Sequence, residues 1–122
     1  MKPKIYIAGK ITGEPDYKAK FDAAEQEYNK KGYTVLNPAV LPGGLQPADY
    51  MRICFAMIDS ADVVAFLPGY RQSAGAQLEL QYCLYIDKNV KLPECKCAVL
   101  IRENNGTIVC GQCGTTFKEV KP

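Results

Sequence analysis

Short apolar runs and longer amphipathic stretches alternate along the first 90 residues of the chain. The apolar runs end at glycine, proline or polar residues and predict buried strands at 4–9, 33–38 and 62–68, with a fourth beginning at 89. Between them, apolar residues recur at helical spacing and predict helices over 16–31, 48–61 and 74–87. This alternation is typical of a parallel sheet covered on both faces, so we expect an α/β domain over residues 1–90.

Ligands bind beyond the carboxyl ends of the strands in such sheets, and three loops take that place here, at 8–16, 37–49 and 68–74. The cations Lys10 and Arg71 in these loops either contact a substrate phosphate or are simply solvated. Asn37 either contacts a ligand or forms a turn before proline. Ser73 can contact a ligand and also cap the third helix, as Asp16 can cap the first.

Two acids have roles that the sequence leaves open. Asp62 opens the third strand, where it either bonds backbone amides at the strand end or contacts a substrate. Glu79 stands among small and apolar residues, four positions after Gly75 and about a turn and a half inside the third helix. An early helical acid usually complements the helix dipole and points to water. The alternative is that Glu79 faces the crevice fed by the three loops.

Composition and charge limit the function only broadly. The chain is 48% hydrophobic, and it has no apolar run near the roughly 20 residues that span a bilayer. Its first residues turn polar too soon for a signal peptide, so we expect a cytoplasmic protein without a membrane partner. There is no histidine, and the net charge is −1 over residues 1–87 and +3 over 88–122. The basic tail is compatible with a nucleic-acid partner or with solubility alone.

Five motifs occur in a recognisable order: "IYIAGKITG", "NPA", "ADYM", "IDSADVVAFLPG" and "SAGAQLE". From about Ile5 to Asp87 the chain resembles small phage and bacterial proteins of the DUF4406 type, which are related to nucleoside 2-deoxyribosyltransferases. The resemblance implies a flavodoxin-like, Rossmann-like three-layer fold and a homo-oligomer. We expect no organic cofactor. It also implies an enzyme that acts on the N-glycosidic bond of a nucleoside or nucleotide, by hydrolysis or (deoxy)ribosyl transfer.

The same resemblance implies roles for particular residues. Glu79, in the Gly75-x-x-x-Glu79 stretch, matches a nucleophile that attacks the anomeric carbon of the sugar. Tyr6 and Gly9 match residues that orient the sugar and the carboxylate, and Ser73 matches a residue that contacts sugar or phosphate. The chemistry suits a carboxylate, because loss of the base leaves an oxocarbenium-like centre that a carboxylate stabilises and traps.

One position departs from the family pattern. The better-known enzymes carry a catalytic Asp on the preceding helix, and Cys54 stands at the matching position here. A thiol is a poor substitute for a carboxyl group that assists the leaving base. The departure favours a rival function, a nucleotide-binding or sequestering module without efficient turnover.

The last 28 residues contain four of the six cysteines, as Cys95-x-Cys97 and Cys110-x-x-Cys113. Between the pairs, "AVLIRENNGTIV" predicts a hairpin with Asn105-Gly106 at its turn. We therefore expect a zinc-ribbon-like segment over 91–122, in which four thiolates hold a structural zinc ion. Free thiols and disulfides are the alternatives, and a nucleic-acid-associated ribbon is a third functional hypothesis. Cys54 and Cys83 lie singly in apolar segments, as buried thiols do.

Overall fold

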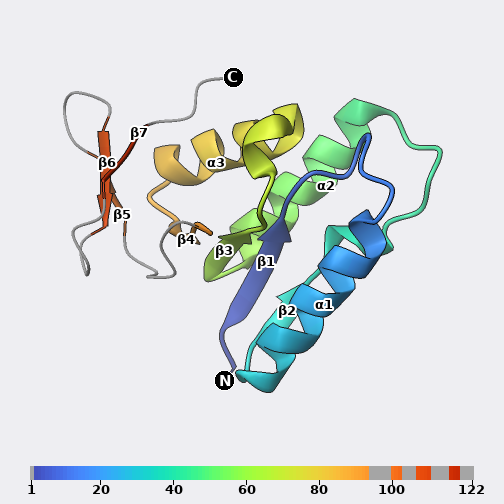
Figure 1. Cartoon of the computed structure of the whole chain (residues 1–122), viewed down its shortest axis with the longest axis horizontal. Helices are drawn as coiled ribbons and strands as arrows, with labels where there is room; N and C mark the ends of the chain where they lie inside the picture. The colour runs from blue at the N-terminus through green and yellow to red at the C-terminus, as the bar shows by residue number, and fades with distance from the viewer. Residues whose placement is uncertain (1, 94–99, 103–106, 111–115, 119–122) are drawn as a thin grey trace.

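The computed structural model describes residues 2–93, 100–102, 107–110 and 116–118, with side chains over 2–93 (Figure 1). Within residues 2–93, four strands form one parallel sheet in the order β2-β1-β3-β4. Their bounds are β1 (Lys4–Ala8), β2 (Thr34–Leu36), β3 (Val63–Phe66) and β4 (Asn89–Lys91). The four predicted strands are therefore confirmed, and β1 and β3 are the two central ones.

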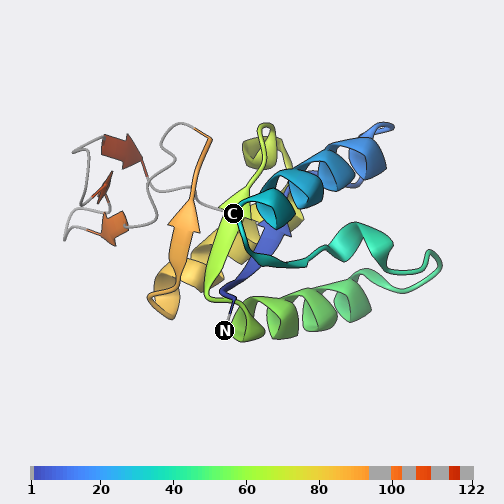
Figure 2. The ribbon, with the colours of Figure 1, turned by 90° about the horizontal axis from the view of Figure 1, so that it is seen from below.

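Three α-helices cover the sheet: α1 (Tyr17–Lys30), α2 (Pro47–Ser60) and α3 (Ala74–Tyr85). Two short 3-10 helices, η1 (Pro38–Val40) and η2 (Tyr70–Gln72), lie in the loops after β2 and β3. Figure 2 shows α1 and α2 on opposite sides of β1. The fold is the expected three-layer α/β arrangement, flavodoxin-like or Rossmann-like. None of the helices in the described part of the chain is long and apolar enough to cross a bilayer.

Successive residues of the central strands face opposite layers, and both layers are apolar. On one face, Ile5, Val63 and Ala65 pack with Tyr28 of α1. On the other, Tyr6 and Val64 belong to a larger core that α2 and α3 complete through Cys54, Ile58, Ala76, Leu80 and Cys83. All four residues of β3 are buried, as its unbroken apolar run predicts. The side chain of Tyr6 thus lies beneath α2 and α3.

Of the two helix caps predicted from the sequence, the structure shows one. The Ser73 hydroxyl oxygen accepts a hydrogen bond from the backbone N–H of Ala76 at 3.2 Å, so the predicted cap of α3 is confirmed. Asp16 stands at the N-cap of α1, but its side chain makes no capping hydrogen bond, and that expectation was wrong. Its backbone, with φ −96° and ψ 16°, is not in the extended conformation that a capping residue typically has.

A second, antiparallel sheet contains β5 (Leu100–Arg102), β6 (Thr107–Cys110) and β7 (Thr116–Lys118). β5 pairs with β6 from Leu100 opposite Cys110 to Arg102 opposite Ile108, which confirms the predicted hairpin pairing. β7, which pairs with β6, was not foreseen. The Asn105-Gly106 turn lies outside the described residues, as do three predicted zinc ligands, Cys95, Cys97 and Cys113.

Candidate functional site

A buried tyrosine–carboxylate pair lies between the sheet and α3. Tyr6, in the middle of β1, is 1% exposed, and Glu79 of α3 is 6% exposed. The Tyr6 hydroxyl donates a hydrogen bond to Oε2 of Glu79. The question left open by the sequence is therefore answered: Glu79 points inward to Tyr6 and not to water.

The local sequence explains how α3 presents this acid. The chain leaves β3 through Gly69, whose left-handed backbone (φ 91°) suits glycine, passes through η2 and enters α3 at the Ser73 cap. Ala76, Leu80 and Cys83 then recur at helical spacing and are buried in the core. Glu79 lies next to this apolar stripe and is drawn into the same layer.

Burial dominates the electrostatics of the pair. Desolvation raises the pKa of Glu79 to about 7, although the hydrogen bond from Tyr6 acts in the opposite direction. Desolvation and the nearby Glu79 raise the pKa of Tyr6, so its phenol stays protonated and remains a donor. Near neutral pH, Glu79 is therefore present both as a neutral acid and as a carboxylate.

Cys54 of α2 borders the same pair, and its thiol and the Tyr6 hydroxyl influence each other's pKa. Burial raises the pKa of this thiol, so it is neutral near pH 7. The two other acids of α2 are engaged elsewhere. Asp59 accepts from the Tyr82 hydroxyl at 2.6 Å, and Asp49 accepts from the backbone N–H of Gln46 at 3.1 Å.

Two predicted glycines have different physical explanations. A Cβ added to Gly9 would lie 3.2 Å from both Leu67 Cβ and Phe21 Cζ, so packing on the α1 side accounts for this glycine. A Cβ added to Gly75 would meet nothing closer than Met51 Sδ at 3.9 Å. Packing therefore does not require glycine at 75, one turn before Glu79.

Asp62, predicted as a substrate-binding residue or a strand-end residue, lies away from this group. It precedes β3, and its carboxylate accepts from the backbone N–H of Lys4 at 2.7 Å and lies 3.8 Å from Lys4 Nζ. Both residues lie at the amino ends of parallel strands, opposite the three loops. The contact with Lys4 is the one that the alternative prediction describes, in which Asp62 bonds an amide at a strand end.

The remaining predicted residues lie in the loops at the carboxyl ends. Asn37 is buried, and its side chain accepts from the Ala39 N–H at 2.9 Å and donates to Glu25 Oε1 at 3.2 Å. Both ends of this amide hold the turn and α1 together, as the turn interpretation expects. Arg71 is exposed, and its Nε donates to the Tyr70 hydroxyl at 3.2 Å. Lys10 is half-buried in the loop after β1.

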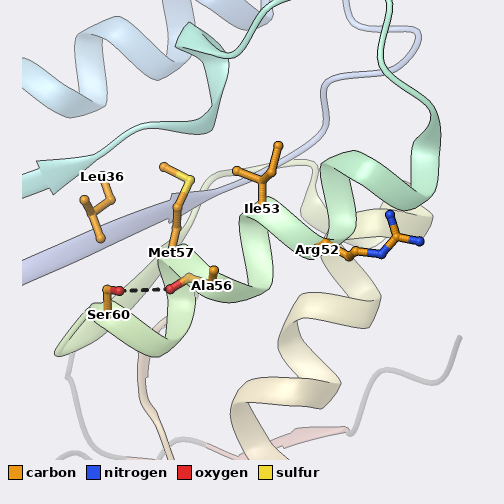
Figure 3. A pocket seen from close by; sticks show the side chains of 6 residues that line it. All are labelled: Leu36, Arg52, Ile53, Ala56, Met57 and Ser60. Atoms are coloured by element: carbon orange, nitrogen blue, oxygen red, sulfur yellow. Dashed lines mark hydrogen bonds between the residues drawn. The ribbon is translucent and has the colours of Figure 1, made fainter.

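Two shallow hollows lie elsewhere on the surface. One, of about 420 Å³, lies against α2 and β2 and is lined by Leu36, Arg52, Ile53, Ala56, Met57 and Ser60 (Figure 3). The other, of about 410 Å³, lies between α1 and the loop after β3, lined by residues that include Lys20, Glu27 and Leu67. Neither hollow includes Tyr6 or Glu79. Within residues 2–93, Cys54, Cys83 and Glu79 also form no cluster that could hold a metal ion.

The domain containing this pair can be placed in a family. The family model of DUF4406, a domain of unknown function, matches residues 3–92. The chain belongs to the DUF4406 family. The match covers the entire parallel sheet and its three helices, and with them Tyr6, Cys54 and Glu79. No protein of curated function matches the chain.

Proposed function

We propose that this DUF4406 protein acts on the N-glycosidic bond of a nucleoside or nucleotide, with Glu79 as the nucleophile and Tyr6 as the residue that orients it. The observation that carries the proposal is the hydrogen bond from the Tyr6 hydroxyl to the buried Glu79 carboxylate. Burying an acid costs free energy, so a buried acid with a pKa of about 7 is a candidate for chemistry more than for stability.

In the proposed reaction, the Glu79 carboxylate attacks the anomeric carbon of the sugar. The bond from that carbon to the base nitrogen breaks, and the base leaves with both electrons and takes a proton from water. Water or a second base then attacks the glycosyl ester and frees the carboxylate, giving hydrolysis or transfer. Tyr6 holds one carboxylate oxygen throughout, which limits the rotamers of Glu79.

The test is release of free base from a panel of ribo- and deoxyribonucleosides and their 5′-phosphates. Glu79→Gln should abolish release because an amide is not a nucleophile, whereas Glu27→Gln, on the exposed part of α1, should leave it unchanged. Base release that persists in Glu79→Gln would exclude Glu79 as the nucleophile. Light scattering on the same samples tests the homo-oligomer that the family resemblance implies.

A second candidate, a nucleotide-binding or sequestering module, is favoured by Cys54. This neutral thiol borders Tyr6 at the position where related enzymes carry an acid. The module predicts nucleotide binding without base release, with affinity unchanged in Glu79→Gln. Cys54→Asp separates the two functions, because it should speed base release by an enzyme and give a module no turnover.

For the tail, we propose that Cys95, Cys97, Cys110 and Cys113 bind one structural zinc ion. The support is their spacing and the β5–β6 pairing, which ends at Leu100 opposite Cys110. Elemental analysis of the purified protein should find one zinc ion per protein chain. The metal should be lost in Cys110→Ser and retained in Cys83→Ser. Nucleic-acid binding by this segment stays a prediction from its charge.

A further inference from the structure

Glu79 is almost closed off within a single chain, so a ligand needs a route to it. Tyr6 and Cys54 form part of the surrounding wall and belong to the packed core, as do Leu80 and Cys83. Close packing leaves such side chains little freedom to move aside. The route must therefore pass a side chain that is not part of this core.

The C-terminal halves of α2 and α3 are held together. Phe55 of α2 and Tyr82 of α3 stack with ring centroids 4.6 Å apart and an angle of 9° between their planes. The Tyr82 hydroxyl also donates to Asp59 at 2.6 Å. These contacts join the two helices on the C-terminal side of Glu79.

In the N-terminal halves of the same helices, a methionine of α2 and a glycine of α3 face each other. Met51 of α2 faces Gly75 of α3, and its Sδ lies 3.9 Å from the position that a Gly75 Cβ would take. Met51 is half-buried, and the partly buried side chains packed against the core do not include it, although they include Met57 of the same helix. Methionine is unbranched and adapts its shape easily. Gly75 leaves the facing side of α3 bare, one turn before Glu79.

We propose that Met51 and Gly75 form the entrance to Glu79, and that the Met51 side chain acts as a gate that sets the size of the group admitted. A pentose bearing a planar base is the class of ligand expected to pass, and a larger side chain at 51 would exclude it. The identity of this ligand rests on the proposed function. The gate itself depends only on the geometry of α2 and α3.

The test is labelling of the Glu79 carboxyl by a water-soluble carbodiimide with glycinamide, followed by peptide mass spectrometry. At about pH 5 the Glu79 carboxyl, with its pKa of about 7, is protonated, so the rate reports access. Met51→Ala should raise the labelling rate about fivefold and Met51→Phe should lower it by a similar factor, because the gate opens or fills. Met57→Ala removes the same atoms from a core-packed methionine, and it controls for general loosening of the fold.

The outcomes separate the gate from the reaction. Equal labelling rates in Met51→Ala, Met51→Phe and the wild-type protein would overturn the gate, as would an equal rise in Met51→Ala and Met57→Ala. Labelling that follows the size of residue 51, in a protein that releases no base, would support the gate and refute the proposed enzyme. Base release, together with a labelling rate that does not depend on the size of residue 51, would support the proposed enzyme and refute the gate.

Discussion

Replacement of Glu79 by Gln should stabilise the protein at alkaline pH and much less at acid pH. In the unfolded chain a glutamate ionises above its ordinary pKa of 4.5, whereas burial raises the pKa of folded Glu79 to about 7. Between these values the folded state binds more protons than the unfolded state. The free energy of unfolding therefore falls as pH rises through this window, and the loss is complete only above about pH 7.

The magnitude follows from the two pKa values. They differ by about 2.5, and each unit corresponds to about 1.4 kcal/mol, so the full cost of ionising Glu79 is about 3 kcal/mol. About 2.5 kcal/mol of this should be lost between about pH 5 and about pH 8. Gln has no such ionisation, and its carbonyl oxygen can still accept from Tyr6.

Urea denaturation at both pH values, followed by circular dichroism, measures the effect. The stability difference between Glu79→Gln and the wild-type protein should grow at the higher pH, whereas Glu27→Gln, an exposed glutamate, should show no such growth. A difference that is the same at both pH values would refute the buried, desolvated carboxylate. So would a wild-type protein that gains stability over Glu79→Gln as pH rises.

Three further predictions test neighbouring parts of the structure. Base release should rise with pH around 7 as Glu79 ionises. The hydrogen bond from Tyr6 lowers the pKa of Glu79, so Tyr6→Phe should raise that pKa and move the rise in rate to higher pH; a pH–rate profile that stays in place would contradict this. Gly9→Ala should lower the free energy of unfolding by about 1–3 kcal/mol through overpacking, whereas Gly75→Ala should leave it unchanged or raise it by up to about 1 kcal/mol. Urea titration compares the two variants, and equal effects would refute the packing argument. Asn37→Ala should lower the free energy of unfolding by about 1–3 kcal/mol, since it leaves a buried turn without its amide partners. An unchanged urea denaturation midpoint would exclude a turn-stabilising role for Asn37.

The sequence by itself determined the elements and their class. The unbroken apolar run of β3, the helical spacing in α1 to α3 and the Ser73 cap are local patterns, and the structure confirms each of them. These predictions succeed because hydrophobic periodicity and capping depend on residues within a few positions of one another. The fold class then follows from the order of the elements.

Only the tertiary structure decided which residues meet. Glu79 at its helical position could face water or the sheet, and the fold turns it inward to a hydrogen bond with Tyr6, 73 residues away in sequence. Asp62 looked similar as a candidate, but parallel pairing with β1 places it at the opposite end of the sheet. Gly9 and Gly75 both lie in motifs of the family, and only their neighbours in the folded chain distinguish them. Gly9 is in tight contact with Leu67 and Phe21, whereas Gly75 has room for a Cβ. Burial, contact and desolvation are properties of the packed layers, so no local pattern could supply them.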